Sequence, residues 1–164
     1  MPREAQADLI RARRRARVVP CRPWGFIVAN LVASAVRHRE TVLFVDASTD
    51  TLDSYMAVAS ADGFCVELAN DAREAFALAN LVHPDVIVLE IADRDALETL
   101  DSLRRGARTG SVPIIAVTSG ADADLNAQAE RCTAHVRKPL VHAELLRLLR
   151  FLAIARARPA RRGP

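Results

Sequence analysis

Short apolar segments alternate with amphipathic segments between Thr41 and Ala153. Five apolar runs have the length and composition of buried strands, at residues 42–45, 64–68, 86–89, 114–117 and 134–137. Each run is followed by a segment with apolar residues at helical spacing, at about residues 50–62, 71–83, 95–105, 122–132 and 141–155. Five such β-α units predict an α/β fold with a parallel, doubly wound sheet covered by helices on both faces.

Capping and turn residues separate these elements. Asp50 and Asp71 each stand where an N-cap would begin a helix. Asp62-Gly63 and Pro84-Asp85 stand where the first two helices should end. The pattern contains no repeat, so we expect a single domain.

Chemically useful side chains end four of the predicted strands. Asp46, Glu90, Thr118 and Lys138 follow the first, third, fourth and fifth apolar runs. In a parallel sheet the carboxyl ends of the strands line one crevice, which is where such folds place their functional sites. Two carboxylates, a hydroxyl and an ammonium together indicate a site for a cation and a phosphoryl group. Pro139 favours a cis peptide bond after Lys138 that fixes the direction of this side chain.

The sequence resembles the receiver domains of bacterial response regulators over residues 41–153. The resemblance is carried by four segments in the expected order, Val42–Asp46, Pro84–Leu89, Pro113–Thr118 and Lys138–Leu140. It implies the CheY-like, flavodoxin-like (βα)5 fold with strand order 2-1-3-4-5.

The resemblance also assigns roles to the residues at the strand ends. In receivers two adjacent acids hold magnesium, an aspartate accepts phosphate from a histidine kinase, and a Thr or Ser and a Lys contact the phosphoryl group. Asp46 matches the first acid, Thr118 the hydroxyl and Lys138 the lysine. Ala47 stands at the position of the second acid, and Glu90 stands at that of the phosphoacceptor aspartate.

These two departures predict a degenerate receiver, or pseudo-receiver. Losing a carboxylate weakens a magnesium site, because this cation needs several close oxygens. The extra methylene of Glu90 moves the reactive oxygen by roughly 1.5 Å, and phosphoryl transfer depends on positioning. We therefore expect no catalytic residue, no enzymatic activity and no resident cofactor, with at most weak Mg²⁺ binding at Asp46. His135 occupies the position where receivers often have an aromatic switch residue.

Two interpretations of Glu90 remain open. Its side chain could reach Lys138 and Thr118 and so hold the pocket permanently in one state without a metal. Alternatively, Glu90 is a relic that pairs with Lys138 because a partly buried charge needs a partner. A Glu90→Gln variant with unchanged structure and partner binding would remove the case for the first interpretation.

The leading prediction is a single-domain response regulator that binds a signalling protein within a phosphorelay. The resemblance implies that the partner, whether a histidine kinase, a phosphotransfer protein or a downstream effector, contacts the last strand and its flanking helices near residues 135–149. The first alternative is a working receiver that uses Glu90 or Asp93 as a non-standard phosphoacceptor.

Charge distribution separates the domain from its ends. Lys and Arg outnumber Asp and Glu by 9 to 3 in residues 1–40 and by 4 to 0 in residues 151–164, whereas residues 41–150 carry 10 against 17. We expect residues 1–40 to be a basic extension, a short helix or a disordered segment, and residues 154–164 a basic tail. A second alternative is therefore a nucleic-acid-associated protein that acts through these ends.

Membrane association and secretion are not expected. No apolar run approaches the roughly 20 residues that a membrane-spanning helix needs. Residues 11–35 contain the parts of a signal peptide, but Asn30 interrupts the apolar run and the basic region is too long. We therefore predict a cytoplasmic protein.

Overall fold

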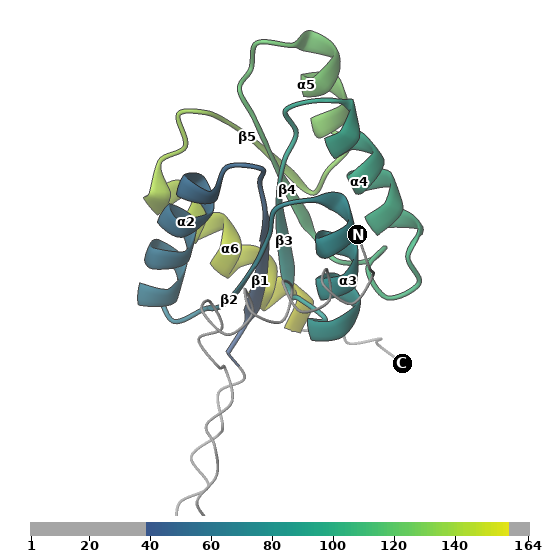
Figure 1. The fold of residues 1–164 in the computed structure, drawn as a ribbon. Helices are drawn as coiled ribbons and strands as arrows, with labels where there is room; N and C mark the ends of the chain where they lie inside the picture. The colour runs from purple at the N-terminus through teal and green to yellow at the C-terminus, as the bar shows by residue number, and fades with distance from the viewer. Residues whose placement is uncertain (1–38, 158–164) are drawn as a thin grey trace, which may run out of the picture. The chain divides into compact units, whose positions relative to one another are not determined.

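A central parallel sheet organises the computed structural model, which describes residues 39–157. The strand order is β2-β1-β3-β4-β5, so the fold predicted from the apolar pattern is confirmed (Figure 1). The strands are β1 (Thr41–Val45), β2 (Cys65–Ala69), β3 (Val86–Glu90), β4 (Ile114–Thr118) and β5 (Ala134–Arg137). All four strand pairs are parallel, as β-α-β connections require.

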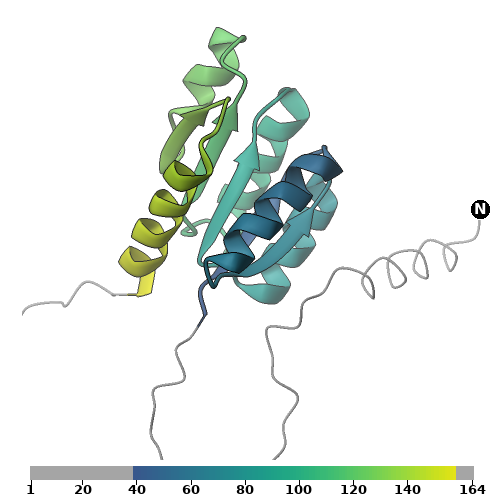
Figure 2. The same ribbon diagram turned by 90° about the vertical axis from the view of Figure 1, so that its left-hand side faces the viewer.

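Helices cover both faces of the sheet. Helices α2 and α6 lie on one face and α3, α4 and α5 on the other, as the two views at right angles show (Figures 1 and 2). The helices are α2 (Thr49–Ala61), α3 (Ala72–Val82), α4 (Arg94–Arg105), α5 (Ala123–Ala129) and α6 (His142–Ala157). No helix in the range 39–157 is long and apolar enough to span a membrane.

Two hydrophobic cores follow from this arrangement, one on each face. Phe44 and Ile115 point into the core beneath α2 and α6, whereas Leu43 and Ile114 point into the core beneath α3, α4 and α5. Neighbouring residues of a strand face opposite sides, so strands buried on both faces must be apolar throughout. This is why the inner strands β1, β3 and β4 appear in the sequence as unbroken apolar runs, whereas the edge strands β2 and β5 contain Glu67, His135 and Arg137.

Several helix ends differ from the expected ones by one to three residues. Ser48, and not Asp50, is the N-cap of α2, and its hydroxyl accepts a hydrogen bond from the Thr51 amide at 3.3 Å. Helix α4 begins one residue earlier than expected because Asp93 caps it. Helix α5 ends at Ala129, three residues before the expected end. Several neighbouring residues of cap type were available at each helix start, and the sequence does not rank them.

The parallel register brings the strand ends together at one edge of the sheet. Glu90 is in register with Val117, and Thr118 is in register with Arg137. The Lys138 amide donates to the Thr118 carbonyl at 2.8 Å, so the chain stays paired with β4 one residue beyond β5. The Lys138–Pro139 peptide bond is cis, as the sequence indicated.

The predicted basic extension and basic tail lie almost entirely outside the described residues. The last helix continues to Ala157, four residues beyond the predicted end of the domain. The expectations for residues 1–38 and 158–164 therefore stay predictions.

Candidate functional site

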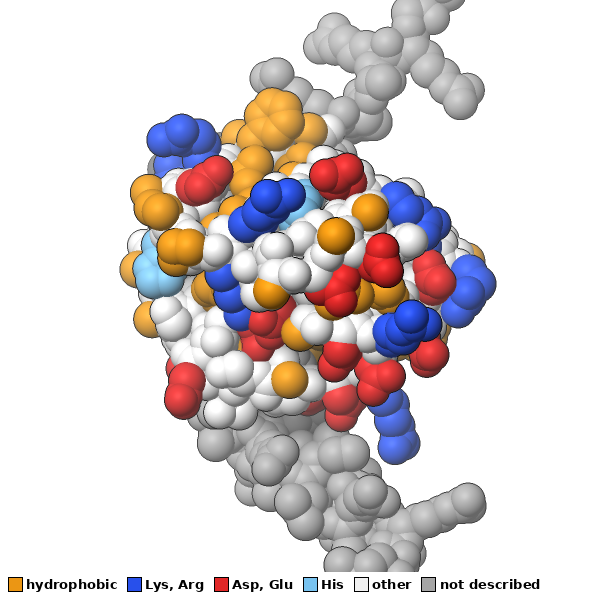
Figure 3. Space-filling view, turned by 90° about the horizontal axis from the view of Figure 1, so that it is seen from above, with side chains coloured by type: hydrophobic (Ala, Val, Ile, Leu, Met, Phe, Trp, Pro, Cys, Tyr) orange, Lys and Arg blue, Asp and Glu red, His pale blue; other side chains and the backbone are white. Residues whose placement is uncertain are grey.

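Four of the predicted site residues meet at the carboxyl ends of the strands. Asp46 directly follows β1, Glu90 ends β3, Thr118 ends β4, and Lys138 directly follows β5. Figure 3 looks down on this face, where Asp and Glu side chains are numerous and Lys and Arg side chains lie among them. The chain thus concentrates ionisable groups where the fold leaves the strand ends open.

Asp46 is the most buried charged group of the site, with 3% of its surface exposed. Its Oδ1 accepts a hydrogen bond from the Ser48 amide at 2.7 Å, whereas its buried Oδ2 has no hydrogen-bond partner. Burial, followed by the neighbouring Glu90 carboxyl, raises the pKa of Asp46 to about 6. The Ser48 amide and the Lys138 ammonium act in the opposite direction. Asp46 is therefore ionised at neutral pH but takes up a proton near pH 6.

Glu90 and Lys138 form the central ion pair of the site. The Lys138 Nζ donates to the Glu90 Oε1, and the same Nζ lies 3.8 Å from the Asp46 Oδ2. The Glu90 side chain is 18% exposed and the Lys138 side chain 34%, so the pair is partly screened by solvent. One ammonium therefore serves two carboxylates that come from different strands.

Thr118 belongs to a second hydrogen-bond network, which includes residues of α5 and β5. Its hydroxyl donates to the Asn126 Oδ1 at 2.7 Å and lies 2.9 Å from the His135 Nε2. Because the single hydroxyl hydrogen goes to Asn126, the contact with His135 requires the imidazole to donate from its Nε2. The Asn126 amide also donates to the Gly120 carbonyl at 3.2 Å. This network joins β4, β5 and α5.

The two networks are separate in this structure. Glu90 pairs with Lys138 but makes no hydrogen bond with Thr118 among the described residues. Of the two contacts expected for the Glu90 side chain, the structure therefore has the one with Lys138 and lacks a hydrogen bond with Thr118. His135, predicted to stand at a switch position, contacts Thr118 directly. The hydroxyl is turned toward α5 and β5, away from the carboxylates.

A magnesium ion does not fit beside the ammonium that already occupies this site. Magnesium takes six oxygens at about 2.0–2.1 Å in near-octahedral geometry, usually from one or two carboxylates and several waters. Asp46 and Glu90 supply two carboxylates, Ala47 supplies none, and the Lys138 ammonium contacts Glu90. No group of three or more His, Cys, Asp or Glu side chains in residues 39–157 is placed to hold a metal.

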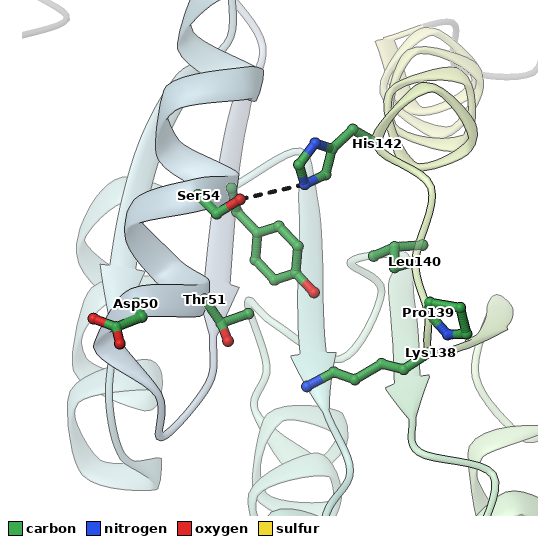
Figure 4. Close-up of a pocket in the computed structure, with 8 residues that line it drawn as sticks. Asp50, Thr51, Ser54, Lys138, Pro139, Leu140 and His142 are labelled. Carbon is green, nitrogen blue, oxygen red and sulfur yellow. Dashed lines mark hydrogen bonds between the residues drawn. The ribbon is translucent and has the colours of Figure 1, made fainter.

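An open groove of about 400 Å³ lies beside the ion pair, between α2 and the segment that leads from β5 to α6 (Figure 4). Lys138 extends along its floor, and the His142 imidazole contacts the Ser54 hydroxyl at 3.3 Å across it. Tyr55 also lines the groove, and burial, followed by the charges of Asp46 and Glu90, raises the pKa of its phenol to about 12. The phenol therefore stays neutral and available as a hydrogen-bond donor.

Sequence reasoning missed Asn126 as a member of the site. Asn126 is only 8% exposed, although it is a polar residue in the short helix α5. Nothing near Asn126 in the chain marks it as buried, and its need for polar partners shows only in the fold. The contact between Ser54 and His142 was also not foreseen, because the two residues are 88 positions apart.

The alternative acceptor Asp93 has a structural role in this fold. It is the N-cap of α4, and its Oδ1 accepts a hydrogen bond from the Ala96 amide at 2.9 Å. No hydrogen bond or ion pair joins it to Lys138 or Thr118 among the described residues. The geometry thus gives no support to phosphoryl transfer at this carboxylate.

Comparison with solved structures identifies the fold as that of CheY-like receiver domains. The chemotaxis protein CheY4 of Vibrio cholerae matches with a TM-score of 0.64 and 24% identity, over 70% of this chain and 98% of that chain. A CheY-like receiver domain protein from Methanospirillum hungatei matches with a TM-score of 0.65 and 22% identity, over 73% and 97%. A response regulator from Desulfuromonas acetoxidans matches with a TM-score of 0.60 and 26% identity, over 70% and 98%. No family model and no curated protein sequence matches the chain.

Proposed function

We propose that this protein is a cytoplasmic response regulator of a two-component pathway that acts by binding another protein and works without phosphorylation. It is a binding module and not an enzyme in this proposal. The fold supports the receiver assignment, and the altered strand ends support independence from phosphate.

The observation that carries the proposal is the pairing of Glu90 with Lys138. Glu90 ends β3, the position of the phosphoacceptor in the receivers that the sequence resembles. Its carboxylate is held by the ammonium that would otherwise meet an incoming phosphoryl group. The added methylene displaces the carboxylate by roughly 1.5 Å, and in-line transfer tolerates little displacement. Both effects oppose phosphorylation at this residue.

The proposed partner surface consists of β5, α5 and α6. Val141, in the segment between β5 and α6, and Phe151 and Ile154, on α6, are large apolar side chains that are 61%, 68% and 53% exposed. Exposed apolar side chains of this size are common at protein interfaces, where their burial contributes to binding. A histidine kinase, a phosphotransfer protein or a downstream effector is the expected partner.

Affinity capture followed by mass spectrometry tests the proposal. The full chain is immobilised with and without a small phosphodonor, and the bound proteins are identified. We expect a two-component signalling protein to be captured equally in both conditions and to be lost with Phe151→Asp. Leu81→Asp is the matched control, because Leu81 is 62% exposed on α3, on the opposite face of the sheet.

Two outcomes would overturn the proposal. Capture that requires the phosphodonor would indicate a working phosphoacceptor. Enrichment of nucleic acid in place of a signalling protein, with steep salt dependence that is lost on deletion of residues 1–40, would favour the basic ends as the functional element.

The role of Glu90 within this proposal is tested by Glu90→Gln. If the ion pair with Lys138 holds the partner surface in its binding state, the variant captures less partner although it remains folded. Unchanged capture and an unchanged amide spectrum would make Glu90 a relic that pairs with Lys138 for charge balance alone. Thr118 is not expected to take part, because its hydroxyl bonds Asn126 and His135 and not Glu90.

A further inference from the structure

Lys138 is the only lysine in a chain that has 23 Lys and Arg residues. Every other basic position is arginine, including Arg137 immediately before it. General charge requirements are therefore met by guanidinium groups throughout this protein. The single exception stands at the strand ends, in contact with a carboxylate, which indicates that this position requires an ammonium in particular.

The contacts of Lys138 explain what an ammonium can do there that a guanidinium cannot. An ammonium is a compact point charge with three donors, whereas a guanidinium is a planar fork that prefers both oxygens of one carboxylate. The Nζ donates to a single oxygen of Glu90 and at the same time lies 3.8 Å from the Asp46 Oδ2. A single small cation is thereby placed between oxygens that belong to two different strands.

The charge balance of the pocket supports the same conclusion. Asp46 is almost fully buried and its Oδ2 has no hydrogen-bond donor. A buried carboxylate oxygen without a donor is costly unless a cation is near. Among the described residues, Lys138 makes the only ion pairs with Asp46 and Glu90. Its backbone amide, bonded to the Thr118 carbonyl, fixes the start of the side chain.

We propose that the Lys138 ammonium is the built-in cation of the Asp46–Glu90 carboxylate pair and that it closes this pocket to divalent ions. The pairing of both carboxylates with this ammonium, and not their number, then keeps a magnesium ion out of the site. Removing the ammonium should leave two carboxylates without a counter-ion and create affinity for Mg²⁺. This inference concerns the pocket of the proposed function, which it deepens, but it rests on contacts within the chain and not on any partner.

Magnesium titration of the ¹⁵N-labelled full chain tests the inference. The amides of residues 46–48 and of Glu90 report on the pocket, and NaCl at equal ionic strength is the reference. We expect no saturable shift for the wild type at millimolar Mg²⁺. Lys138→Met should gain saturable shifts, with an affinity at least about tenfold above that of the wild type. Adding Glu90→Gln to Lys138→Met should abolish the gain.

The reactivity of the only lysine gives a second measurement that needs no variant at this position. Acetylation of Lys138 by an amine-specific reagent is followed by peptide mapping, which separates it from the amino terminus. Magnesium that entered the carboxylate pair would release the ammonium and accelerate labelling. We expect the wild-type rate to be independent of Mg²⁺ and to rise several-fold in Glu90→Gln.

Either of two results would overturn the inference. The first is saturable Mg²⁺ binding by the wild type at the pocket amides, or labelling of Lys138 that accelerates with Mg²⁺. The second is a folded Lys138→Met variant that gains no affinity for Mg²⁺. These results are distinct from a failure of the proposed function, because a wild type that binds Mg²⁺ but accepts no phosphoryl group would refute the inference and leave that function standing.

Discussion

At the scale of single residues, Asp46 combines a buried carboxylate with an incomplete set of partners. One oxygen accepts from the Ser48 amide and the other has no donor. Its pKa of about 6 lies above the ordinary value of 3.8, so the folded protein binds this proton more tightly than the unfolded chain does. The contribution of the group to stability is thus greatest below pH 3.8 and is lost as the pH rises through 6.

The variant Asp46→Asn directly tests the predicted direction of this pH dependence of stability. The amide is neutral at every pH, so the variant avoids the cost of an ionised buried carboxylate, on the order of 1–3 kcal/mol at pH 8. We expect the variant to be more stable than the wild type at pH 8, with a difference that shrinks as the pH falls toward 4. Urea unfolding at a series of pH values measures this difference, and a difference that does not change with pH would contradict the assignment.

Asn126 is a residue-scale feature that only the folded structure shows. Its Oδ1 is the acceptor for the buried Thr118 hydroxyl, and no short-range pattern pairs residues from a strand and a helix in this way. The sequence located Thr118, Glu90 and Lys138 because each ends an apolar run. It could not locate Asn126, because nothing near this residue in the chain distinguishes a buried amide from an exposed one.

Removing the Asn126 amide should destabilise the protein. Asn126→Ala leaves the Thr118 hydroxyl without its acceptor, which costs about 1–3 kcal/mol when the group is buried. Asn80→Ala is the matched control, because the Asn80 amide bonds only the carbonyl one helical turn away, at Phe76. Urea unfolding should show a loss for Asn126→Ala that clearly exceeds that of the control. Equal losses would mean that the network around Thr118 contributes little.

At the scale of elements, the strands were easier to predict than the helix ends. The inner strands β1, β3 and β4 are buried on both faces, so their apolar runs are unbroken and their positions follow from composition alone. Helix starts depend on which of several neighbouring polar residues reaches a free amide, as at Ser48 and Asp50. Helix α5 ends at Ala129, and the local pattern, which predicts a helix to residue 132, does not mark this end.

Asp93 was a candidate phosphoacceptor in the sequence, and in the structure it is the N-cap of α4. Asp93→Ala should cost about 1 kcal/mol of stability, whereas Asp93→Asn should cost little, since asparagine caps a helix as well as aspartate does. Urea unfolding of both variants measures the difference. If Asp93→Ala is as stable as the wild type, the bond to the Ala96 amide contributes nothing and the role of Asp93 must lie elsewhere.

At the scale of the whole molecule, the fold and the site were predictable to different degrees. Alternating strands and helices determine which side chains meet, so Asp46, Glu90, Thr118 and Lys138 were correctly placed at one edge of the sheet. The division of these four residues into two hydrogen-bond networks was not predictable. It depends on the lengths of the side chains and on Asn126 of α5, which binds Thr118. The fold therefore follows from the pattern of the whole domain, whereas the proposed loss of phosphorylation rests on Ala47 and Glu90 alone.

The measurement that tests this account most directly is the intact mass of the full chain after incubation with a small phosphodonor and Mg²⁺. An active receiver domain treated in parallel is the positive control, and Ala47→Asp/Glu90→Asp shows whether restoring both acids restores acceptance. The account predicts that the wild type gains no phosphoryl group under conditions that label the control. A phosphoryl adduct on the wild type that disappears in Glu90→Gln would contradict it.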